Sequence, residues 1–269
     1  MLHLINPAWQ ENPTNPITNQ PFAADWVILH LTDSQDYTFL NGAQNGSAYA
    51  FLVSRHYNQW QYAVSDFLQY HTSLGSHILC AMSQQDYTDT IRLFKDHPYN
   101  EYTLRSYEPA VLVHSTTPNG WLGIQFDAQL RSWNSLRTSN SIKENTPIGS
   151  SLGDPADFSD YIMFSDGNLS GEIVVSSKEK GRICMDVNAH YHPGARLYFD
   201  AAAIARDGLL LRDGAHLKVK DRLPLYPYLL TVITPQTLSL SPEDHTPARF
   251  TYLANQTFAA QFPHLQFNP

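Results

Sequence analysis

The residues of this chain that could do chemistry are concentrated in its second half. The apolar run Ala110–Val113 predicts a strand, and His114, Ser115 and Thr116 follow at the end of that run. An imidazole can accept or donate a proton near neutral pH, and the two hydroxyls can donate and accept hydrogen bonds. A lone histidine at a strand end more often satisfies a nearby backbone group than binds a ligand. These three residues are therefore site candidates in combination with other groups.

Two further places carry candidate side chains. Tyr161 and Ser165 stand at the ends of a short apolar run, and Asp213 and His216 lie on either side of Gly214 in a predicted turn. A carboxylate or an imidazole in such a turn could act as a base that orients a nucleophile. The alternative is a purely structural role, in which Tyr161 is a core aromatic and Asp-Gly is an ordinary turn dipeptide.

Motifs of the common enzyme classes are missing from the sequence. We find no Gly-x-Gly-x-x-Gly, no phosphate-binding loop, no Gly-x-Ser-x-Gly and no His-Glu-x-x-His. This removes the usual Rossmann, NTPase, α/β-hydrolase and zinc-protease interpretations. His190 and His192 could form half of a metal site, but no Cys, Asp or Glu cluster at ligand spacing accompanies them. The sequence therefore predicts no bound metal.

Composition predicts a globular protein of one large or two modest domains. The chain has 269 residues, 42% of them apolar, and 25 acidic against 17 basic residues give a net charge of −8. The apolar fraction argues against disorder, and the acidic balance argues against a dedicated duplex-DNA binder. We expect neither a membrane span nor a signal peptide. Cys80 and Cys184 are far apart and are expected to be reduced, which predicts a cytoplasmic protein.

The first part of the chain predicts an arm followed by a small unit. Residues 1–24 are rich in proline and read as an extended arm, and residues 25–108 form an α/β unit of unknown role. Within this unit the pattern predicts strands at 26–31, 49–53 and 77–82 and an amphipathic helix at 58–70. Ser83, three residues before Asp86, predicts a capped second helix.

The second part, residues 109–269, predicts many short strands and few helices. Besides Ala110–His114 we expect strands at 161–164, 172–175, 182–187, 195–199, 209–211, 216–219 and 228–233. Helices are expected at 118–130 and 248–262, with a loop at 139–155. Glu172 is then a charge at the edge of a strand. The fold class is α+β, with antiparallel or split sheets in this domain.

Several blocks between residues 109 and 232 carry a family resemblance. Val111-Leu112-Val113-His114-Ser115-Thr116 and Trp121-Leu122-Gly123-Ile124 match a strand ending in His-Gly-Thr and the Gly-Leu turn that follows it. Tyr161-Ile162-Met163-Phe164-Ser165 takes the place of a His-Val-His-Leu-Ser strand. Asp213-Gly214-Ala215-His216-Leu217 and Leu223-Pro224-Leu225-Tyr226-Pro227-Tyr228-Leu229 fit an Asn-Gly turn followed by Val-Pro-x-x-Tyr-Leu. In their order and spacing these blocks resemble the ADP-ribosyltransferase superfamily, in its RNA 2′-phosphotransferase branch.

The resemblance implies a split antiparallel β-sheet domain that binds NAD. By this pattern His114 contacts the adenosine-side ribose, the backbone of Ser115 holds the nicotinamide amide, and Tyr161 stacks on the nicotinamide ring. Thr116 and Ser165 complete the implied NAD-binding set. His114 and Tyr161 are also implied as catalytic residues. Asp213 and His216 are assigned as further catalytic candidates because they occupy the turn where many of these transferases carry a glutamate.

The resemblance leaves three functions open. The leading expectation is an ADP-ribosyltransferase that modifies a macromolecule, either protein or nucleic acid, as bacterial toxins and effectors of this superfamily do. The absence of the usual glutamate favours a non-catalytic module that binds NAD or ADP-ribose. RNA 2′-phosphate removal is the third, although Ser159 stands where that branch usually carries an arginine.

Overall fold

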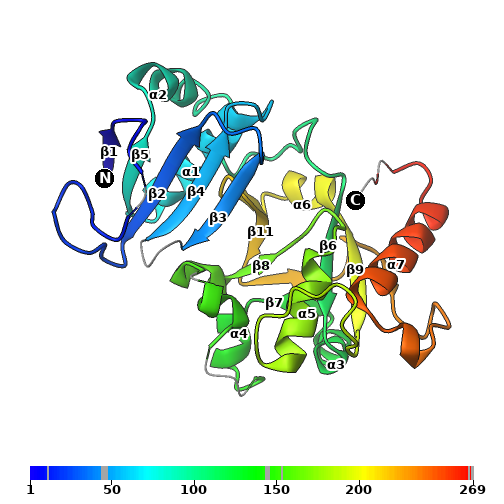
Figure 1. The fold of residues 1–269 in the computed structure, drawn as a ribbon. Coiled ribbons are helices and arrows are strands. Elements are labelled where there is room, and N and C mark those ends of the chain that lie inside the picture. Colours follow the sequence, from blue (N-terminus) through cyan, green and yellow to red (C-terminus); the bar gives the residue numbers. More distant parts are fainter. Residues whose placement is uncertain (11, 44–47, 143–145, 153, 266, 268–269) are drawn as a thin grey trace. The chain divides into compact units, whose positions relative to one another are not determined.

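The computed structural model describes residues 1–10, 12–43, 48–142, 146–152, 154–265 and 267. The chain divides into two compact units, and Figure 1 shows the elements of each. Unit 1 comprises 1–101, 149–156 and 211–216, and unit 2 comprises 102–148, 157–210 and 217–269. Part of the predicted loop at 139–155 lies outside the described residues. The chain is a mixed α+β protein, as expected.

Unit 1 is built on a five-stranded sheet in the order β1-β5-β2-β4-β3. All neighbouring strands are parallel except β3, which runs antiparallel to β4. The apolar runs of β2 and β4 are buried nearly throughout, as is typical of central parallel strands. The strands are β1 (Leu2–Ile5), β2 (Trp26–Thr32), β3 (Phe39–Ala43), β4 (Tyr49–Ser54) and β5 (His77–Ala81).

Two helices accompany this sheet. Helix α1 (Trp60–Ser73) buries Val64, Phe67, Leu68 and other side chains, which confirms the amphipathic pattern. Helix α2 (Gln84–Ile91) begins at Ser83, whose hydroxyl accepts a hydrogen bond from the Asp86 amide, so the expected cap is confirmed. The N-terminal arm differs from the expectation because Leu2–Ile5 pairs with β5 as an edge strand.

Unit 2 contains a three-stranded antiparallel sheet in the order β13-β9-β6. Next to it β8 pairs with β11, and β7 pairs with β12, both antiparallel. Two apolar cores fill this unit, one around Leu197 and Phe199 and the other around Tyr198 and Phe258. The strands are β6 (Val111–Thr116), β7 (Gln129–Arg131), β8 (Tyr161–Met163), β9 (Ala195–Asp200), β11 (Leu217–Lys220), β12 (Arg222–Pro224) and β13 (Leu229–Ile233). The short strand β10 (Leu210–Arg212) has its last two residues in unit 1.

The helices of unit 2 include the two that the sequence predicts. They are α3 (Pro118–Asp127), α4 (Trp133–Thr138), α5 (Ser170–Lys180), α6 (Ala201–Arg206) and α7 (Pro247–Gln261). Short 3-10 turns occur at Ala156–Asp160 and Pro242–Asp244, and a third, Ile148–Leu152, lies mostly in unit 1. Figure 1 shows α5 and α7 beside the strands β6 and β9.

The expected strand at 172–175 is wrong, because these residues belong to α5. Glu172, Val175 and Ser176 are buried at the i, i+3 and i+4 spacing of a helix face, and Ser177 beside them is buried as well. Three of these four positions are polar, so an apolar pattern could not reveal the helical period. The expected strand at 182–187 is also wrong, since this segment follows α5 without regular structure.

Candidate functional site

The candidate site is the edge of β6 that faces away from β9. On this edge Val113 exchanges two backbone hydrogen bonds with Ser165, of 2.9 and 3.0 Å. Backbone groups of alternate residues in a strand point to the same side, so the N–H and C=O of Ser115 face this edge as well. In the part of the chain that the structure describes, neither group has a backbone partner. Two residues beyond the bridge, the N–H and C=O of Ser115 therefore stand without a backbone partner among the described residues.

Helix α5 closely approaches this open edge. A Cβ atom added to Gly171, in the first turn of α5, would lie 2.7 Å from Ser115 Oγ. A larger residue at 171 would require the Ser115 hydroxyl to shift, so the start of α5 lies close against the end of β6. In the first turn of α5, the amide of Ser170 donates to Asn168 Oδ1, and the amides of Glu172 and Ile173 donate to the carbonyl of Leu169. The first turn of α5 thus lies beside the Ser115 edge.

His114 is anchored to β8 by its ring. Its Nδ1 lies 3.2 Å from the carbonyl oxygen of Met163, and because a carbonyl can only accept, Nδ1 carries the proton. The pKa of His114 is lowered to about 4, chiefly by burial; the hydrogen bond to Met163 opposes this lowering, and the charge of Lys178 adds to it. At neutral pH the ring is uncharged and presents Nε2 as a hydrogen-bond acceptor.

The protonation state of His114 is directly testable. We expect ¹⁵N NMR of the imidazole to show the neutral Nδ1–H tautomer at pH 6, where an unperturbed histidine is mostly charged. The folded pKa lies below the usual 6.5, so the unfolded chain binds a proton first as the pH falls. The contribution of the neutral His114 to the free energy of unfolding is therefore complete above about pH 6.5 and is lost as the pH falls toward 4. A titration midpoint near 6.5 in the folded protein would contradict this.

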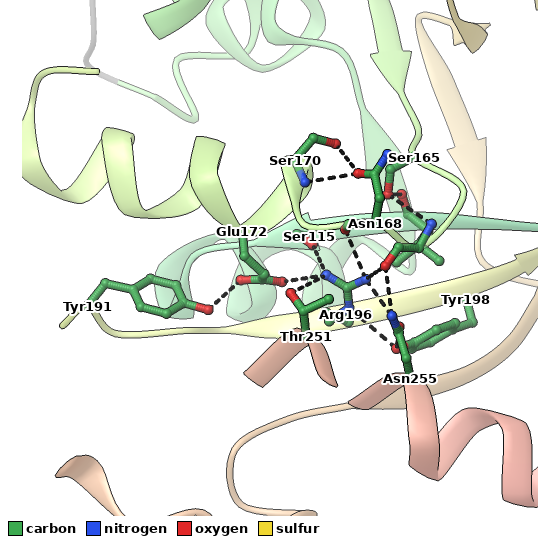
Figure 2. A network of polar contacts seen from close by, with 12 residues as sticks. Ser115, Ser165, Asn168, Ser170, Glu172, Tyr191, Arg196, Tyr198, Thr251 and Asn255 are labelled. Atoms are coloured by element: carbon green, nitrogen blue, oxygen red, sulfur yellow. Dashed lines mark hydrogen bonds and ion pairs between the residues drawn. The ribbon is translucent and has the colours of Figure 1, made fainter. Parts of the chain in front are cut away.

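A buried arginine organises the residues behind the edge. Arg196 on β9 pairs with Ser115 in the β6 ladder, and its side chain is fully buried. Figure 2 shows its guanidinium at the centre of a polar network from β6, β9, α5, α7 and the loop before α5. It donates to Gly167 O (2.7 Å), Asn168 O (3.5 Å), Ser115 Oγ (3.4 Å), Glu172 Oε1, Tyr198 OH, Thr251 Oγ1 and Asn255 Oδ1 (each 3.3 Å).

Glu172 is the counter-ion of this arginine. Both carboxylate oxygens are engaged, one by Arg196 and the other by the phenol of Tyr191, which donates at 2.6 Å. All three side chains are fully buried. Burial opposes the charge of Arg196, but Glu172 and Tyr198 raise the pKa of the guanidinium. Glu172 is therefore held inside the protein as a structural anion rather than at the edge of a strand.

Tyr161 lies at the start of β8 with its side chain nearly buried. The ammonium group of Lys218, on the paired strand β11, is 4.5 Å from the centre of the Tyr161 ring and 4.7 Å from that of Phe158. A cation over an aromatic face is attracted by the ring quadrupole. One face of Tyr161 thus carries a lysine, and the residue is only 8% exposed.

The remaining residues of the predicted NAD set lie in unit 2 near His114. Ser165 forms the backbone bridge to Val113, and its hydroxyl accepts a hydrogen bond from the Gly167 amide. The carbonyl of Thr116 accepts from the Gly194 amide at 3.0 Å. The structure therefore brings His114, Ser115, Thr116 and Ser165 together around the end of β6.

Asp213 and His216 belong to unit 1. One carboxylate oxygen of Asp213 accepts hydrogen bonds from the amides of Ala215 and His216, which makes it a turn-forming residue. His216 Nδ1 is 3.3 Å from the same carboxylate, and Nε2 accepts from Asn41 at 3.1 Å. Both ring nitrogens are thus engaged within unit 1, and the catalytic role of these two residues stays a prediction.

Sequence reasoning missed the central member of the network. Arg196 lies in the run Ala195–Phe199, which is otherwise apolar and predicts a buried strand. Arginine is almost never fully buried without partners, so its place in such a run signals a buried polar network. No comparable signal marks Thr251 or Asn255, whose positions in α7 look like those of any helix.

Two hollows open on unit 2. The first has a volume of about 510 Å³ and lies between the loop Gly167–Leu169 and α7, where it shares Asn168, Thr251 and Asn255 with the network. The second, of about 600 Å³, is polar and includes Arg131, Asp160 and Arg222. Among the described residues no three His, Cys, Asp or Glu side chains are placed to hold a metal ion. No described helix has the length and apolar character needed to cross a membrane.

Comparisons with known proteins identify no relative of this chain. No protein-family model matches the chain, and searches of curated proteins and of solved structures find no match either.

Proposed function

We propose that the chain is an NAD-dependent ADP-ribosyltransferase that modifies a macromolecular acceptor. The observation that carries this proposal is the open edge of β6 at Ser115, beside a neutral histidine. A carboxamide such as that of nicotinamide has an NH₂ group that donates and a carbonyl that accepts, which complement the C=O and N–H of Ser115. Two such hydrogen bonds would orient the nicotinamide without any charged side chain.

His114 supplies the second contact. Its Nε2 accepts a hydrogen bond from a ribose hydroxyl, because Nδ1 is committed to Met163 and the ring is uncharged at neutral pH. The resemblance described above assigns these roles to this histidine and to the backbone after it. Tyr161 would contribute the ring face that Lys218 does not cover.

The reaction transfers the ADP-ribosyl group of NAD. The acceptor nucleophile forms a bond to the ribose carbon, the electrons of the nicotinamide–ribose bond leave with nicotinamide, and the nucleophile releases a proton. Positive charge develops on the ribose in the transition state, so oriented hydrogen bonds and restraint of the substrate supply much of the catalysis. The free Cys80 and Cys184 fit a reducing compartment, and we place the enzyme in the cytoplasm.

A non-catalytic NAD-binding module is the second candidate. It is favoured by Glu172, since a carboxylate buried against Arg196 and Tyr191 is not available to assist the departure of nicotinamide. Calorimetry with NAD, combined with an assay for released nicotinamide, separates the two functions. Binding without release or transfer supports the module, and activity on a 2′-phosphorylated oligonucleotide supports RNA 2′-phosphate removal instead.

The test of the enzyme is transfer from labelled NAD to cell extract. We expect His114→Ala to weaken NAD binding about tenfold and to lower transfer about a hundredfold, because a ribose hydroxyl loses its acceptor and the substrate is misplaced. His56→Ala removes an exposed histidine of unit 1 and serves as the matched control. Equal activity in the two variants, or no transfer by the unaltered protein, contradicts the proposal.

A further inference from the structure

The C-terminal helix α7 holds the group that organises the candidate site. Thr251 and Asn255 lie one turn apart on α7, and both accept hydrogen bonds from the guanidinium of Arg196 at 3.3 Å. Asn255 also donates to Gly167 O at 2.8 Å and accepts from Tyr198 OH at 2.9 Å. Figure 2 shows these side chains of α7 meeting the guanidinium. Helix α7 thus contacts both the arginine and the loop before α5.

The same guanidinium contacts both sides of the open edge. Through Nη1 it donates to the hydroxyl of Ser115, and through Nη2 it donates to the carbonyls of Gly167 and Asn168. These two carbonyls belong to the loop that joins the Ser165 bridge to α5. Because the N–H donors of the planar guanidinium are fixed relative to one another, a rotation that changes one of these hydrogen bonds changes the others as well. Arg196 therefore links the Ser115 edge to the loop before α5 through hydrogen bonds.

We propose that Arg196, oriented by Thr251 and Asn255 of α7, is a positioning residue for the NAD site, so that α7 is required for NAD binding without touching NAD. This inference rests on the proposed function. It extends the site to residues beyond 109–232, the range of the resemblance. Glu172 neutralises the charge, whereas α7 supplies the contacts that fix the orientation of the guanidinium.

The experiment measures the dissociation constant of NAD by calorimetry on the full chain, at a temperature where circular dichroism shows every variant folded. Thr251→Val keeps the shape of the side chain but removes the acceptor for Arg196. We expect NAD binding to weaken about fivefold, within the range typical of coupling through a side-chain network. Thr251→Ser restores the hydroxyl and most of the affinity. Thr257→Val makes the same change elsewhere on α7, at a partly buried position outside the network, and leaves the affinity unaltered.

Arg196→Lys provides a second measurement. Lysine keeps the charge opposite Glu172 but cannot reach β6, α5 and α7 together, so we expect NAD to bind at least about tenfold more weakly. If this variant does not fold, the threonine series decides the matter alone. A lower melting temperature of Thr251→Val with an unchanged dissociation constant shows a purely structural role and overturns the inference. No NAD binding by the unaltered protein overturns the proposed function, and the inference with it.

Discussion

Glu172→Ala is expected to lower the free energy of unfolding by about 3 to 5 kcal/mol, the usual result of leaving a buried charge without its partner. Arg196 remains fully buried in this variant and loses its counter-ion, and the phenol of Tyr191 loses its acceptor. The other oxygens around Arg196 are uncharged and cannot compensate for the lost charge. Chemical denaturation followed by circular dichroism measures the effect as a shift of the midpoint at constant slope.

Two controls separate charge from packing. Glu243→Ala removes an exposed carboxylate and should change stability by less than about 0.5 kcal/mol. The double variant Glu172→Leu with Arg196→Met removes both charges together, and we expect it to recover much of the lost stability, since apolar replacement of a whole buried pair is often nearly neutral. A single variant as stable as the unaltered protein would show that Glu172 does not hold the arginine in place.

Gly194→Ala is the second variant with a large expected effect. An added Cβ would lie 2.3 Å from the carbonyl carbon and oxygen of Thr117 and 2.5 Å from the carbonyl oxygen of Thr116. These are backbone atoms, so the clash can be relieved only by moving the chain at the end of β6. We expect the free energy of unfolding to fall by about 2 to 3 kcal/mol, as in other overpacked interiors.

We also expect Gly194→Ala to affect NAD binding, because the clash lies next to the candidate site. Thr116 is adjacent to Ser115, so a displaced end of β6 moves the open edge, and NAD binding should weaken as stability falls. Gly123→Ala is the matched control, since nothing lies within 4 Å of its added Cβ and it sits in helix α3. That change should be neutral or stabilising by up to about 1 kcal/mol. Equal melting temperatures for the two alanine variants would contradict the close contact at Gly194.

The sequence by itself predicted those elements whose signals are local. The strand at 110–114, the cap at Ser83 and the terminal helix near 248–262 depend on neighbours within a few residues of the chain. The mixed α+β class follows from the same local patterns. The family resemblance proposed His114, Ser115, Thr116 and Ser165, and the structure places them near one another, while their role in binding NAD stays a prediction.

The tertiary structure decided the rest, because those features depend on partners far apart in sequence. Arg196 lies 81 residues from Ser115 and 59 from Asn255, and no local pattern indicates that the three meet. Glu172 likewise depends on a distant partner. The local pattern around it predicts a strand, whereas in the structure it lies on the buried face of α5 because it pairs with Arg196. A buried polar network forms only where donors and acceptors from distant parts of the chain match one another. The pattern of apolar residues along the sequence does not reveal which groups will match.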